Sequence, residues 1–175
     1  MNVRPSDAVA SLTQGTAKAR SLSGIKNVCA FWLGRRCFGV DIRIVREVVT
    51  IDSVMPVPIS PPELLGLFNL RGTPVALIDL ARVLDLPATE RPDAAAVKSR
   101  SAFVLRSTAL TAALLIDRME IVLPVSPEFL TAADAADEHP AVLGFFEAGS
   151  RGGLMITVLD ADGLLERFDK LKFRT

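Results

Sequence analysis

The 175-residue chain contains no tyrosine, one histidine and only two cysteines. His139 has no second histidine and no cysteine cluster to form a zinc site with. Nucleophilic catalysis usually needs a base beside the nucleophile, and nothing near His139 resembles that arrangement. Cys29 and Cys37 are too few for a disulfide framework in so apolar a chain, so we expect two small buried residues in a reducing compartment. These absences predict a protein that is not an enzyme and that needs no metal and no cofactor.

The chain also lacks an excess of charge and any long apolar run. Twenty basic residues balance twenty acidic ones, which argues against a nucleic-acid partner and against a polybasic membrane patch. No apolar run approaches the ~18 residues of a transmembrane helix. Residues 1–25 carry interrupting charges and lack the apolar core of a signal peptide. We expect a cytoplasmic protein without membrane insertion, whose N-terminal tail is flexible, with a binding arm as the alternative.

What the sequence does contain is a series of short strand-like segments separated by turns. Many short strands with frequent turns predict a mainly all-β fold, as a sandwich or a pair of barrels. Two short helices are expected, one that Asp79 caps over 80–84 and one at the C-terminus, 161–175. The predicted strands are 28–33, 37–42, 44–51, 75–78, 102–106, 112–116, 121–125 and 154–159.

The chain reads as two similar halves on either side of a polar loop at 87–100. Gly66-Leu67-Phe68 precedes one strand-ending aspartate much as Gly144-Phe145-Phe146 precedes another. We predict an internal duplication within one domain at 26–168, with lobes at roughly 26–86 and 101–160; a four-bladed propeller is the alternative. Catalytic carboxylates need two different environments in one cleft, so repeated strand-ending aspartates are expected to be structural. These aspartates are Asp41, Asp79, Asp117 and Asp160.

A single arginine, Arg71, stands between an apolar run and a glycine turn. Gly72 can take a positive φ and turn the chain sharply. Pro74 has no N–H and suits the start or edge of the next strand. Val75–Ile78 reads as a short buried strand. Arg71 is therefore expected at the mouth of a turn, where its planar guanidinium suits bidentate pairing with a carboxylate.

The run from Gly66 to Leu80 closely resembles the signature of the CheW family, the adaptors that couple chemoreceptors to the histidine kinase CheA. It reads Gly-Leu-Phe-Asn-Leu-Arg-Gly-Thr-Pro-Val-Ala-Leu-Ile-Asp-Leu. The resemblance covers about Val28 to Leu165. It implies two small five-stranded β-barrel lobes packed around a shared hydrophobic core and a non-enzymatic role. The implied partners are the regulatory domain of a CheA-type kinase and the cytoplasmic tip of a chemoreceptor, so that the protein would be recruited to membrane-associated receptor arrays.

By resemblance, Glu47 and Arg71 lie close together on the partner-binding surface. The alternative is an ordinary surface ion pair worth ~0–1 kcal/mol, although arginine is enriched at interface hot spots. Val45 reads either as core or as part of the same surface, and the resemblance favours receptor contact. Gly66 is expected where backbone approaches closely, within the fold or from a partner. The other expected partner-binding residues are Leu67, Asn69, Leu70 and Gly72.

Two other functions stay open at this point. The chain could serve a chemosensory-like pathway that governs surface motility or gene regulation. It could also be a small-molecule-binding β-barrel, which would require a polar-lined cavity with convergent titratable groups.

Overall fold

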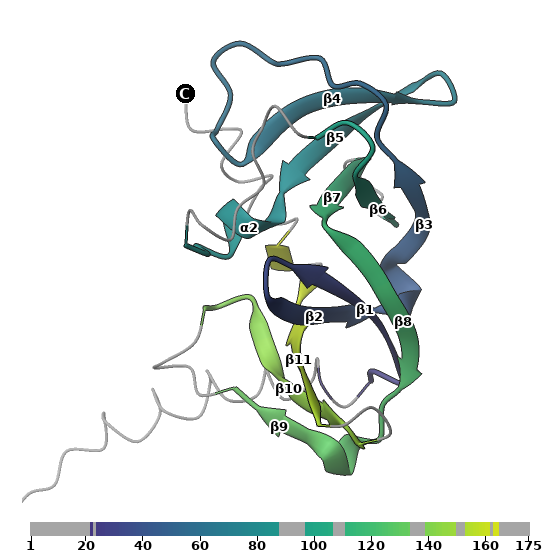
Figure 1. Cartoon of the computed structure of the whole chain (residues 1–175), viewed down its shortest axis with the longest axis vertical. Coiled ribbons are helices and arrows are strands. Elements are labelled where there is room, and N and C mark those ends of the chain that lie inside the picture. The colour runs from purple at the N-terminus through teal and green to yellow at the C-terminus, as the bar shows by residue number, and fades with distance from the viewer. Residues whose placement is uncertain are drawn as a thin grey trace, which may run out of the picture.

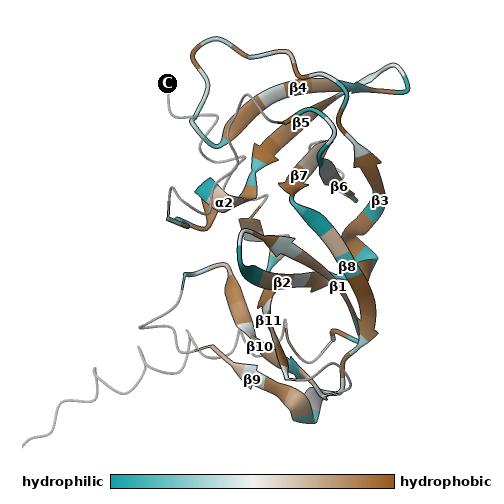
Figure 2. Cartoon of the chain, in the orientation of Figure 1, coloured by the Kyte–Doolittle hydropathy of each residue, from teal (hydrophilic) through white to brown (hydrophobic). Residues whose placement is uncertain are grey.

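Two β-sheets make up most of the chain in the computed structural model, which describes residues 22, 24–87, 97–106, 111–133, 139–149, 153–161 and 163–164 (Figure 1). Most of the expected N-terminal tail (1–25), most of the 87–100 loop and nearly all of the expected C-terminal helix (161–175) lie outside these residues. Figure 2 shows that the strands are predominantly apolar, whereas polar residues gather in the turns and loops.

The first sheet has six strands in the order β8-β1-β2-β11-β10-β9. Neighbouring strands are antiparallel except β2 and β11, which are parallel. Its strands are β1 (Asn27–Leu33), β2 (Arg36–Asp41), β8 (Arg118–Pro124), β9 (Leu130–Ala132), β10 (Val142–Ala148) and β11 (Leu154–Leu159).

The second sheet has five strands in the order β3-β6-β7-β5-β4, and its parallel pair is β5 and β7. Three short helical segments complete the described elements: η1 (Ile42–Ile44), α2 (Leu80–Val83) and η4 (Pro127–Phe129). The strands of this sheet are β3 (Val45–Thr50), β4 (Leu64–Leu70), β5 (Thr73–Asp79), β6 (Ser101–Leu105) and β7 (Ala112–Ile116). The mainly all-β fold and the helix after Asp79 are confirmed.

The expected closed five-stranded barrels are wrong in detail, because both sheets are open and the first has six strands. The reason lies in β3 and β8. Each follows directly on a hairpin strand, β2 or β7, yet pairs in the opposite sheet. Each sheet therefore combines strands from both halves of the chain, β1 and β2 with β8 to β11 in the first and β3 to β5 with β6 and β7 in the second. The two sheets thus divide the chain differently from the expected lobes at roughly 26–86 and 101–160.

The strand orders support the predicted duplication. In each sheet, a hairpin (β1–β2 or β6–β7) has an edge strand on one side and a parallel strand on the other. The strand beyond that neighbour, β4 or β10, carries a register shift just before Gly66 or Gly144. A Cβ at either glycine would meet a backbone oxygen at 2.3 Å, so both halves use glycine for the same close approach.

The four strand-ending aspartates are structural, as expected. Asp79 caps α2 by accepting a hydrogen bond from the Arg82 N–H at 3.2 Å. Asp160 accepts one from the Gly163 N–H at 3.0 Å. In the same way, Asp41 accepts from the Arg43 N–H and Asp117 from the Gly34 N–H.

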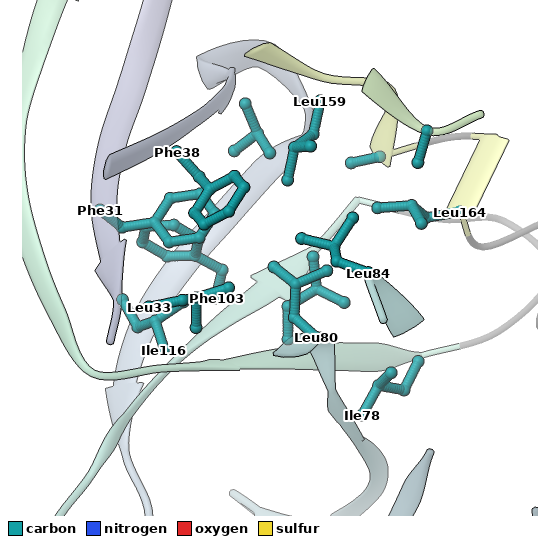
Figure 3. Packing of buried hydrophobic residues seen from close by; sticks show 14 of the residues in the cluster. Phe31, Leu33, Phe38, Ile78, Leu80, Leu84, Phe103, Ile116, Leu159 and Leu164 are labelled. Atoms are coloured by element: carbon teal, nitrogen blue, oxygen red, sulfur yellow. The ribbon is translucent and has the colours of Figure 1, made fainter. Parts of the chain in front are cut away.

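The core between the two sheets is filled by side chains from both. Phe31 packs edge-on against Phe103 with ring centroids 5.1 Å apart, and stacks on Phe38 at 6.1 Å. Leu80 and Leu164 extend this cluster toward α2 and the last described residues (Figure 3). The shared apolar core expected from the sequence is present.

Strand β1 is buried on both faces, so its residues alternate between two cores. Phe31 and Leu33 face the shared core, whereas Val28 and Ala30 belong to a cluster on the opposite face of the first sheet. The two cysteines are free and buried, as expected. Burial raises the pKa of both thiols, that of Cys37 to about 11 with Glu120 as a smaller contributor.

Candidate partner-binding surface

The β4–β5 hairpin presents Arg71 at the first position of a two-residue turn. Leu70 pairs with Thr73, and the two residues between them both have positive φ, +52° at Arg71 and +87° at Gly72. Positive φ at both positions is characteristic of a type I′ turn, which matches the twist of the flanking strands. The Asn69 Oδ1 accepts a hydrogen bond from the Gly72 N–H at 2.7 Å. The turn therefore fixes the direction in which the Arg71 side chain leaves the hairpin.

Arg71 forms a two-pronged ion pair with Glu47 of β3. The Nη2–Oε2 distance is 2.8 Å and the Nη1–Oε1 distance is 3.4 Å. The Arg71 side chain is 74% exposed, whereas that of Glu47 is 20% exposed. The expected proximity of the two residues is confirmed, and the fork geometry leaves a large part of the guanidinium open to solvent.

This ion pair joins the two edges of the second sheet along a line that we call the seam, where β3 and the loop after it approach the β4–β5 hairpin. β3 and β4 are its two edges in the hydrogen-bonding order, yet the sheet curls enough for a β3 carboxylate to reach the β4–β5 turn. Farther along the seam, Met55 and Leu67 exchange backbone hydrogen bonds of 2.7 and 2.8 Å. The surface is thus built where two edges of one sheet meet.

The apolar residues that were expected on this surface are partly buried. Val45 and Leu67 pack against the shared core, and Leu70 packs against the second sheet's own cluster. The Val45 carbonyl also accepts a hydrogen bond from the Arg106 Nε at 3.2 Å. Each of these side chains therefore anchors the surface from below and offers only part of itself to a partner.

Gly66 lies in the interior and not at the hairpin tip. Its φ is +147°, and a Cβ would lie 2.3 Å from the Met55 carbonyl oxygen. Of the two readings of this glycine, a close backbone approach within the fold is the one found. The exposed residues at the hairpin tip are Asn69, Arg71 and Gly72, and the partly buried Glu47 of β3 reaches the tip through its ion pair with Arg71.

Several exposed apolar side chains escaped the sequence analysis. Val48 lies on β3 next to Glu47, and Met55 and Ile59 lie in the loop that follows. Phe129 of η4 and Met155 of β11 are also exposed. Strand periodicity marks such residues only when the register of each strand is known, which explains why they were missed.

Phe129 and Met155 form part of an open groove of about 470 Å³ on the first sheet. Apolar and acidic side chains line it together. The lining residues are Glu128, Phe129, Thr131, Phe145, Glu147 and Met155.

No cluster of three or more His, Cys, Asp or Glu side chains suited to a metal ion occurs among the described residues. In that same portion, no helix is long and apolar enough to span a membrane.

Residues 27–169 match the model of the CheW-like domain family. The chemotaxis protein CheW of Thermotoga maritima is 26% identical over 144 residues, which cover 79% of this chain and 87% of that protein. The chemotaxis protein CheW of Treponema pallidum is 40% identical over 50 residues, a span of only 29% of either protein. Among solved structures, the scaffolding protein TtCheW of Thermoanaerobacter tengcongensis aligns with a TM-score of 0.66 at 23% identity, over 80% of this chain and 87% of that one. This structural match establishes the shared fold.

Proposed function

Since the chain belongs to the CheW-like domain family, we propose that it is a non-enzymatic adaptor that couples chemoreceptors to a CheA-type histidine kinase. Family membership supports a scaffold role in chemotaxis. The proposed partners are the regulatory domain of the kinase and the cytoplasmic tip of the receptor. The adaptor would act in the cytoplasm, at membrane-associated receptor arrays.

The observation that carries this proposal is the ion pair between Arg71 on the hairpin tip and Glu47 on β3. An arginine with most of its surface open, oriented by a carboxylate and a fixed turn, is the type of side chain that dominates protein interfaces. Its guanidinium keeps donors available for a carboxylate of a partner. We therefore assign the partner-binding surface to Glu47, Asn69, Arg71 and Gly72, supported from below by partly buried Val45, Leu67 and Leu70 and by the Gly66 backbone.

The proposed mechanism is positional. An adaptor that contacts both partners holds the kinase at a set orientation to the receptor. Kinase activity changes only if those contacts differ in free energy between two states of the assembly. The filled core between the sheets supports this role over that of a small-molecule-binding barrel, because the space that such a ligand would occupy holds Phe31, Phe38 and Phe103.

The test is a calorimetric titration of the chain with the regulatory domain of the CheA-type kinase from the same cell. Wild type, Arg71→Ala and Glu47→Ala are compared, and circular dichroism verifies that all three are folded. We expect wild type to bind and each variant to bind at least about tenfold more weakly, the loss typical of an interface residue worth about 1.4 kcal/mol. Because the ion pair is exposed, we expect each variant to lose no more than ~1 kcal/mol of folding stability. A folded wild-type chain that does not bind the kinase domain would refute the coupling role.

A further inference from the structure

The loop between β3 and β4 presents an apolar residue in a backbone conformation that the residue disfavours. Ile59 has a φ of +54°, in the left-handed region that β-branched residues avoid because the side chain crowds the backbone. No packing offsets this strain, since Ile59 is fully exposed at 107%. Glycine or asparagine would suit this backbone better. Neither local conformation nor the core explains an isoleucine here.

The rest of the loop holds Ile59 in a fixed position. Met55 is tied to β4 by its two backbone hydrogen bonds with Leu67. The Ser60 Oγ donates a hydrogen bond to the Val57 carbonyl at 2.9 Å. Figure 1 shows this loop arching beyond β4, away from the first sheet. Prolines fix φ at four further positions of the loop, which lowers the entropy lost on binding. They are Pro56, Pro58, Pro61 and Pro62.

The chemistry around Ile59 indicates what it would contact. Met55, 70% exposed, adds a second apolar side chain to the loop. No charged residue occurs from Met55 to Pro62, but Asp52 and Glu63 flank that segment. A projecting apolar side chain fits a concave apolar pocket, and acidic flanks favour a pocket whose rim is basic.

Two other occupants fit this chemistry poorly. In a second copy of the chain, the apolar groove carries Glu128 and Glu147, which would face Asp52 and Glu63 across the contact. Like charges placed opposite each other at an interface are destabilising. An anionic membrane surface attracts Lys and Arg, neither of which occurs between residues 52 and 63. The charge pattern therefore favours a different protein.

We propose that Ile59 is an anchor that inserts into an apolar, basic-rimmed pocket on the regulatory domain of the partner kinase. The identity of this partner rests on the function proposed above. A folded kinase domain can offer such a concavity. The Ile59 side chain contributes to binding and not to folding, which explains why an isoleucine occupies this strained position.

The test measures affinity and stability together. The regulatory domain of the kinase is titrated calorimetrically with wild type, Ile59→Asn and Ile59→Leu. We expect Ile59→Asn to weaken Kd on the order of 10- to 100-fold, because it removes a buried apolar side chain from the complex. The same variant relieves the backbone strain, so its Tm is expected to rise by roughly 2–4 °C. Ile59→Leu keeps an apolar anchor and is expected to stay within about threefold of the wild-type affinity.

A matched control separates strain relief from binding. Ser99 has a φ of +68° and is exposed, so Ser99→Gly relieves a similar strain without removing an apolar group. We expect a higher Tm and an unchanged Kd for this variant.

Three results would overturn the inference. Equal affinity of wild type and Ile59→Asn would do so while leaving the adaptor role intact. A lower Tm for Ile59→Asn would show that the side chain stabilises the fold. Self-association of the chain in sedimentation velocity that Ile59→Asn abolishes would assign the anchor to a second copy. If wild type does not bind the kinase domain at all, the adaptor role fails first, and the assignment of this partner fails with it.

Discussion

Replacing Gly66 by alanine tests whether the seam of the second sheet depends on one missing side chain. The new Cβ would lie 2.3 Å from the Met55 carbonyl oxygen and 2.6 Å from the Val54 side chain. The backbone oxygen cannot move away without breaking the two hydrogen bonds that Met55 forms with Leu67. Gly66→Ala is therefore expected to open the seam beside β4.

Two contributions determine how much stability Gly66→Ala is expected to lose. The φ of +147° is essentially restricted to glycine and costs another residue about 1–3 kcal/mol. The two lost hydrogen bonds contribute about 0.5–1.5 kcal/mol each. We expect Gly66→Ala to lower the free energy of unfolding by about 2–6 kcal/mol.

Gly72→Ala is the matched control. Gly72 also has a positive φ, +87°, but nothing lies within 4 Å of the position that its Cβ would take. Gly72→Ala should lower the free energy of unfolding only by the cost of a positive φ at alanine, about 1–2 kcal/mol. Urea unfolding followed by circular dichroism gives both values, and hydrogen exchange reports the Met55 and Leu67 amides directly. If Gly66→Ala is no more destabilising than Gly72→Ala, or if those amides stay protected, the reasoning about the seam is wrong.

Two further predictions concern buried titratable groups. Asp79 is only 1% exposed, caps α2 and pairs with Arg82 at 3.1 Å. Asp79→Ala should therefore lower the free energy of unfolding in urea by about 2–4 kcal/mol. Asp160→Ala is the control, with an expected loss of about 0.5–2 kcal/mol, and an equal or smaller loss for Asp79→Ala would contradict the prediction. Because burial raises the pKa of Cys37 to about 11, the folded state holds its proton while the unfolded state loses it near pH 9. The Cys37 contribution to stability should therefore be full below about pH 9 and fall as the pH rises toward 11. Between pH 8 and 11, the free energy of unfolding of Cys37→Ala should fall by less than that of wild type. Equal losses would count against a thiol that burial keeps protonated.

Local sequence patterns predicted the strands whose apolar runs are continuous. Strands β7 and β11 have the predicted bounds, and the β1–β2 hairpin forms around the Gly34 turn. Strand β4 was not recognised as a strand, because Gly66 and the adjacent register shift interrupt its alternation. Strand β9, only three residues long, is too short to show any period.

Those local patterns could not predict which strands far apart in the sequence pair with each other. Nothing local indicates that β3 and β8 cross to the opposite sheet, because strand pairing depends on contacts far apart in the sequence. The residues alone placed Arg71 at a turn and favoured a carboxylate partner. The choice of Glu47 came from the family resemblance, and the structure brings the two together. Ile59 escaped notice because its unusual φ and complete exposure are properties of the folded loop.

The passage of the chain from the first sheet to the second at β3, and back at β8, also bears on how the chain folds during synthesis. β1 and β2 are made early, but their neighbours β8 and β11 are made after β3 to β7. The first sheet therefore cannot complete its hydrogen bonding until nearly the whole chain has left the ribosome. Contacts between residues so distant in sequence slow folding and leave early strands with unpaired edges. The two halves are thus expected to fold in one late cooperative step, because neither half contains all the strands of either sheet.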